Sequence, residues 1–196
     1  MIHAVGLVLG VVGAVVLITL AIRSANGMNI GAALVYVTGL LSMLGASAAY
    51  NCWPPGTLKR FIRRFDHSAI YLLIAATYTP FLLHIRDGTI CVTILIFVWI
   101  IAFAGIALKL LWTQRFERTS IALYLALGWS GALVYESVAT ALRPITLWLI
   151  AIGGLLYSVG VIFHLCERLR FHSAIWHCFV LCAACAHYAA VLSCVI

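Results

Sequence analysis

Several acidic, imidazole, amide and hydroxyl side chains lie at the ends of long apolar runs in this sequence. Such groups donate and accept protons and bind metal ions, so hydrolytic and metal-binding sites are built from them. If the runs are helices, the ends that carry these groups meet at one end of a helical bundle. We therefore predict a shared polar pocket that comprises Ser47, Asn51, Asp66, His67, Ser173 and His177.

The apolar runs predict an all-α integral membrane protein with seven transmembrane helices. The 196 residues are 65% hydrophobic and 9% charged, and the mean hydropathy is +1.15. These values exclude a soluble globular domain. Runs of about 20 apolar residues can span a bilayer as helices. We predict one domain, residues 1–196, with spans at 3–22, 30–50, 67–84, 89–108, 120–138, 145–164 and 174–195. We interpret the first run as a retained helix and not a signal peptide, because no basic residue precedes it.

The basic residues predict the orientation of the bundle. Of the twelve Lys and Arg residues, nine fall on the side of the amino terminus and three, Arg23, Arg86 and Arg143, fall on the other side. Because cytoplasmic loops carry the excess of Lys and Arg, we predict a cytoplasmic amino terminus and a carboxyl terminus outside. Basic loops facing anionic lipid account for the net charge of +7, so the sequence indicates membrane lipids and no nucleic acid as partners.

This topology places the predicted pocket at the cytoplasmic face. Several helix ends place polar groups at the same depth in the membrane. This favours a shared pocket over helix ends whose polar groups are unrelated to one another. The alternatives are that Asp66 caps the third helix and that Asn51, before Trp53-Pro54-Pro55, only ends the second. His187 alone lies deep, about 15 Å beyond His177 at the helical rise, and should face the bundle interior and find a partner there.

Three stretches resemble the hemolysin III family. They are residues 47–51 (Ser-Ala-Ala-Tyr-Asn), 64–81 (beginning Arg-Phe-Asp-His-Ser and ending Thr-Tyr-Thr-Pro-Phe) and 174–181 (Ala-Ile-Trp-His-Cys-Phe-Val-Leu). That family belongs with the progestin and adiponectin receptors and is more distantly similar to alkaline ceramidases. The resemblance covers essentially the whole chain, and it implies a bacterial inner-membrane location.

The resemblance also implies a zinc site near the cytoplasmic face. Its pattern is Ser-x3-His at the end of the second helix, Asp at the start of the third and His-x3-His at the start of the seventh. Three imidazoles and a water would form a catalytic type of zinc centre. Ser47, Asp66 and His177 match this pattern.

Two of the three imidazole positions differ from the pattern, since Asn51 and Ser173 stand there. His172 is five residues before His177, which places it about 140° away around a helix. His67 and His164 are substitute ligands that the topology allows. We therefore predict a degraded zinc site with no cofactor as the default, and with His177, Asp66 and His172 as the metal candidates if zinc binds.

Three functional classes remain open, and we favour a non-enzymatic role in lipid sensing or membrane homeostasis. The alternative is a zinc-dependent hydrolase of lipid amides or esters, with Asp66 as the catalytic base and His177 as a ligand. A pore-forming, cytolytic protein is the third and weakest class. It is the weakest because His187 and Glu136 are too few polar groups to line a conduit. The four-residue spacing of Gly6 and Gly10 suits a homodimer interface or tight packing inside the bundle.

Cysteines lie on the last predicted span, and one proline lies in the third. Cys178, Cys182 and Cys185 follow one stripe of the last span, where we expect them to pack as small apolar residues, and we expect no disulfides. Pro80 should kink the third helix near its outer end.

Overall fold

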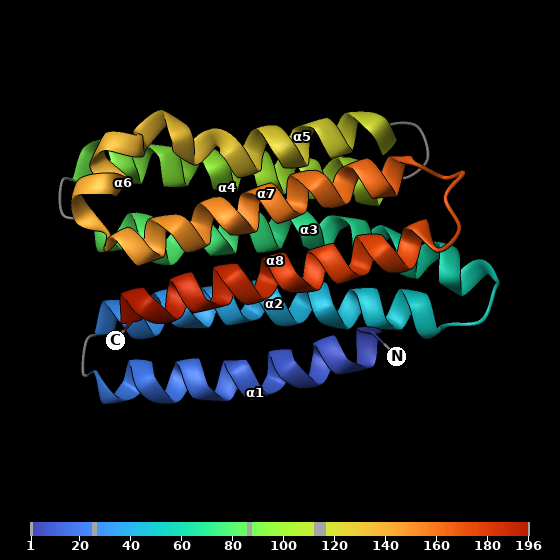
Figure 1. Cartoon of the computed structure of the whole chain (residues 1–196), viewed down its shortest axis with the longest axis horizontal. Coiled ribbons are helices and arrows are strands. Elements are labelled where there is room, and N and C mark those ends of the chain that lie inside the picture. The colour runs from blue at the N-terminus through green and yellow to red at the C-terminus, as the bar shows by residue number, and fades with distance from the viewer. Residues whose placement is uncertain (1, 25–26, 86–87, 112–116, 196) are drawn as a thin grey trace.

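The computed structural model describes residues 2–24, 27–85, 88–111 and 117–195, and every regular element within these ranges is a helix (Figure 1). The elements are α1 (Ile2–Arg23), α2 (Gly27–Cys52), α3 (Thr57–His84), α4 (Gly88–Leu111), α5 (Glu117–Trp129), the 3-10 helix η1 (Ser130–Val134), α6 (Tyr135–Ala141), α7 (Pro144–Leu165) and α8 (His172–Val195). Since α5, η1 and α6 follow one another without a loop, they form one long segment. The described part of the chain therefore has the seven helical rods that the hydropathy pattern predicts.

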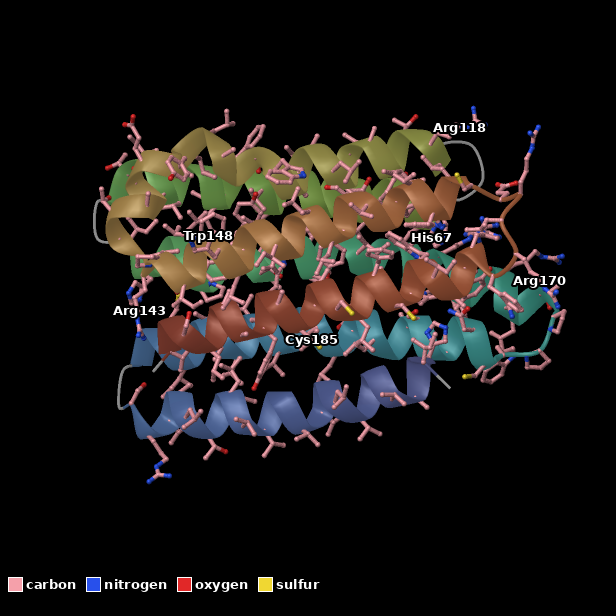
Figure 2. All side chains as sticks on the ribbon, in the orientation of Figure 1. His67, Arg118, Arg143, Trp148, Arg170 and Cys185 are labelled. Atoms are coloured by element: carbon pink, nitrogen blue, oxygen red, sulfur yellow. The ribbon has the colours of Figure 1, made fainter. Side chains whose placement is uncertain are left out.

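The rods lie side by side with their long axes roughly aligned (Figure 1). Consecutive helices pack against each other in the pairs α1 with α2, α2 with α3, α3 with α4, and α7 with α8, and α8 closes the bundle against α1 and α3. The two chain ends lie at opposite ends of the bundle (Figure 1). His67, Arg118 and Arg170 lie at the end of the amino terminus, and Arg143 lies at the other end (Figure 2). That the first of these ends is cytoplasmic stays a prediction.

Among the described residues, six segments are long and apolar enough to cross a membrane, namely Ile2–Arg23, Ile30–Cys52, Thr89–Leu111, Arg118–Ala141, Pro144–Leu165 and His172–Val195. The seventh rod, α3, is more polar than these segments. It is central in the bundle, and neighbouring helices cover it. Its hydroxyl groups are paired internally: Thr77 and Thr79 donate to the carbonyl oxygens one turn earlier, and Trp99 donates to Thr79 over 3.2 Å. A helix surrounded by helices contacts little lipid and tolerates these groups.

The third helix also begins earlier than predicted. We expected the polar segment before residue 67 to be a loop, but α3 starts at Thr57. The prediction was wrong because hydropathy detects the apolar part of a helix and not its polar extension. The helix continues through Pro80 to His84.

The glycines near the amino terminus pack inside the bundle. Gly6 lies against Leu44 and Leu181, and a methyl group on Gly10 would collide with Leu44. Of the two explanations for the spacing of Gly6 and Gly10, the structure shows tight packing inside the bundle. That the chain forms a homodimer stays a prediction.

Two further predictions about α8 have different outcomes. Cys178, Cys182 and Cys185 are exposed, so the prediction that they pack as small apolar residues was wrong. His187 does face the interior, as predicted: its ring lies against Gly153, and its Nε2 is 3.2 Å from the carbonyl oxygen of Ile150.

Candidate functional site

A histidine of the first helix joins two of the predicted pocket residues. The Oγ of Ser47 lies 3.3 Å from Nδ1 of His3, and Ser47 is buried near the end of α2. The His3 ring meets the His177 ring edge to face, with centroids 4.3 Å apart. Three helices, α1, α2 and α8, therefore meet through one hydroxyl and two imidazoles. We call His3, Ser47 and His177 the inner polar cluster.

His164 lies beside this cluster at the end of α7. Its ring is 5.2 Å from that of Trp176, and His164 is close enough to His177 for an electrostatic interaction. Trp176 itself packs on Gly160 of α7. The helix pair α7 and α8 thus brings a third imidazole towards the inner polar cluster.

Asn51 and Ser173 take no part in the cluster contacts that the structure shows. The Asn51 amide donates to the Ser47 carbonyl oxygen over 2.9 Å, which satisfies a backbone group near the end of α2. The helix ends one residue later, at Cys52, which agrees with the helix-stop alternative for Asn51. Ser173 is in the first turn of α8 and is exposed.

Asp66 is half-buried in the third turn of α3. Because α3 begins nine residues earlier, the capping alternative for Asp66 was wrong. Burial raises the pKa of Asp66 to about 6, while the nearby positive charge of Arg63 acts in the opposite direction. An acid with this pKa exchanges protons near neutral pH.

His67 and His172 are two further imidazoles that the sequence named as pocket or metal candidates. His67 is half-buried, and its carbonyl oxygen accepts a hydrogen bond of 2.8 Å from the Tyr124 hydroxyl of α5. His172 is the first residue of α8, and its buried Nδ1 has no hydrogen-bond partner in the structure.

These donors do not fit the zinc site that the resemblance implies. Among the described residues, no three His, Cys, Asp or Glu side chains are placed to share a metal ion. The Asn51 side chain is already bonded to its own helix, and Ser173 is exposed. His3 and His177 contact each other directly and His3 is bonded to Ser47, so these imidazoles are not arranged as the three ligands that a catalytic zinc site requires.

Comparison with known proteins agrees with this architecture. The family model described as "Haemolysin-III related" matches residues 1–188. The chain belongs to this family. It is 35% identical over 190 residues to the hemolysin-3 homolog of Bacillus subtilis (strain 168). The matched region covers 97% of this chain and 89% of the relative.

Two further relatives show the range of the family. Hemolysin-3 of Bacillus cereus is 38% identical over 180 residues, covering 91% of this chain and 82% of the relative. The monocyte to macrophage differentiation factor of Homo sapiens is 32% identical over 164 residues, covering 80% of this chain and 67% of the relative.

The sequence reasoning missed His3, which it placed only as the start of the first span. A signal for it existed: the first residues of an odd-numbered span share their side of the membrane with the last residues of an even-numbered one. His3 therefore had the same predicted depth as Ser47 and His177.

Proposed function

We propose that this haemolysin-III-related protein is a non-enzymatic membrane protein that responds to its lipid surroundings, with the inner polar cluster as a degraded zinc site. The observation that supports this proposal is the contact of His3 with both Ser47 and His177. In this cluster the side chains of the protein contact one another, whereas the resemblance implies that such side chains bind a metal ion. A cluster of this kind links helices and supplies no activated water.

The inner polar cluster is also the point where α1 is held at this end of the bundle. The outer side of α1 is largely apolar, with Val5, Val8 and Val12 each at least half exposed. A helix that contacts lipid over most of its length responds to bilayer thickness by tilting. Tilting α1 would change the His3 contacts, which connects lipid properties to α2 and α8.

The test compares the purified chain with a His3→Ala variant in nanodiscs of short-chain and long-chain phosphatidylcholine. Thermal unfolding should depend on chain length in the wild type, and this dependence should be weaker in His3→Ala. A His84→Ala variant is the control, because His84 is exposed at the end of α3. An equal dependence in all three proteins would contradict the proposal.

The hydrolase alternative is supported by one observation, the half-buried Asp66 with a pKa of about 6. A base of that strength is suitable for activating water near neutral pH. The assay is mass spectrometry of long-chain lipid amides and esters incubated with the reconstituted protein. Cleavage that is lost in Asp66→Asn would establish the hydrolase and remove our proposal. Dye release from the same liposomes tests the pore, which remains the third prediction.

A further inference from the structure

The first turns of α3 have two chemically different sides. Leu58, Phe61 and Phe65 are spaced three and four residues apart, so they share one side of the helix. They are 47%, 52% and 46% exposed, and the two phenylalanine rings touch edge to face at 5.0 Å. Trp53, just before the helix, is 44% exposed. This is an exposed aromatic surface at the end of the bundle.

Four cations lie around the rest of the same helical turns. At about 100° per residue, Arg60 and Arg63 fall opposite Leu58 and Phe65, and Lys59 and Arg64 fall at the two borders between these sides. Two of them fix the helix: Lys59 donates to the Trp53 carbonyl oxygen over 2.9 Å, and Arg64 donates to the Leu110 carbonyl oxygen over 3.0 Å. Arg60 is exposed.

The turn between α7 and α8 repeats this combination at the same end of the molecule (Figure 2). Arg168 and Arg170 are exposed, and Leu169 and Phe171 are 43% and 66% exposed. Phe171 has a φ of 67°, a left-handed conformation that bulky residues rarely adopt. The Arg170 guanidinium lies 4.9 Å from the Phe171 ring centroid. A strained backbone therefore presents an aromatic ring and a cation together at the surface.

An amphipathic helix with aromatic residues on one side and Lys and Arg on the other is typical of binding at a negatively charged bilayer surface. We propose that residues 57–65 of α3 and the turn at residues 166–171 bind the headgroups of anionic phospholipids. The aromatic side chains enter the interface, and Arg60 and Arg170 contact the lipid phosphates. The occupant is a phospholipid because these exposed aromatic and basic side chains lie at one end of a bundle of membrane-spanning helices, where lipid headgroups are the neighbours. This site is separate from the inner polar cluster and does not depend on the proposed function.

The test is lipid competition on the full chain in detergent, read by native mass spectrometry. Phosphatidylglycerol and phosphatidylcholine with identical acyl chains are supplied in equal amounts. The wild type should retain phosphatidylglycerol preferentially. Each of Arg60→Gln and Arg170→Gln should reduce the preference by up to about five-fold, which corresponds to about 1 kcal/mol per basic residue near an anionic surface. These variants keep Lys59 and Arg64, which hold the helix in place.

Two controls separate this site from general charge effects. Arg143→Gln removes an exposed arginine at the opposite end of the bundle, and it should leave the preference unchanged. Phe61→Ser should reduce retention of both lipids, whereas Phe97→Ser in α4, equally exposed at 56%, should not. Equal retention of the two lipids by the wild type, or an equal loss in Arg143→Gln, would overturn the proposal. So would displacement of the lipid by inorganic phosphate at matched ionic strength, which would indicate a site for free phosphate.

Discussion

At the scale of single residues, the main feature is that His3 occupies the space between Ser47 and His177. The packing is specific in geometry, with a hydroxyl on one imidazole nitrogen of His3 and a second imidazole against its ring. Ser47 and His177 were predicted from their types and spacing. His3 was missed because motif spacing within one stretch of sequence does not detect a partner 44 residues before Ser47.

Replacing His3 should weaken the bundle measurably. His3→Ala removes the hydrogen bond with the buried Ser47 hydroxyl, so we expect a loss of about 1–2 kcal/mol in the free energy of unfolding. The measurement is chemical or thermal unfolding in a single detergent. His84→Ala, at an exposed position, should change stability little. A His3 variant as stable as the His84 variant would show that the contact is not formed.

Asp66 predicts a pH dependence with a definite sign. The folded pKa of about 6 lies above the ordinary value of 3.8, so the folded chain binds the proton more tightly than the unfolded chain. The associated stability is present below pH 3.8 and is lost as the pH rises through about 6. Asp66→Asn cannot ionise, so it should be about 1–3 kcal/mol more stable than the wild type at neutral pH and nearly equal to it in acid.

The measurement for Asp66 is the unfolding free energy of both proteins across this pH range. A difference between Asp66→Asn and the wild type that stays constant with pH would contradict the buried-acid account.

At the scale of elements, the fifth span is divided by the 3-10 helix η1, and a side chain of α3 fills the break. The Tyr78 hydroxyl accepts a hydrogen bond of 2.7 Å from the Gly131 amide and lies within 3.0 Å of the carbonyl oxygens of Leu127 and Gly128. Backbone groups freed from a helix inside a membrane need such partners. Hydropathy could not predict the break, because its cause lies about 50 residues away in another helix.

Tyr78→Phe should therefore destabilise the fifth span. It leaves the Gly131 amide without its partner, at a cost of about 1–3 kcal/mol, and hydrogen exchange should increase at residues 127–134. Tyr135→Phe is the control, since Tyr135 is 64% exposed. Unchanged exchange in Tyr78→Phe would mean that the break is stabilised by other groups.

The packing of α7 against α8 depends on Gly153, because the absence of a side chain there leaves room for the His187 ring. A methyl group on Gly153 would collide with the His187 ring, so Gly153→Ala should separate the helices and reduce stability by about 1–3 kcal/mol. Gly45→Ala is the matched control, because nothing lies within 4 Å of the added methyl group. If both variants unfold alike, the close contact at Gly153 does not contribute to stability.

At the scale of the whole molecule, the class and the number of rods could be predicted because each span must be apolar over a fixed length. The family could be recognised from three stretches such as residues 174–181. The fine arrangement of the site could not be predicted, since it depends on which helix faces turn towards each other at α1, α2 and α8. The exposed cysteines of α8 show the same difficulty: small residues suit a helix contact, yet Cys185 faces outward.

The zinc content of the purified chain tests the central claim most directly. In protein produced with zinc in the medium, the wild type and His177→Ala should both contain far less than one zinc per chain, because two imidazoles in mutual contact make a poor zinc site. The double variant Asn51→His, Ser173→His restores the pattern that the resemblance implies and should gain zinc. About one zinc per wild-type chain, lost in His177→Ala, would contradict the account.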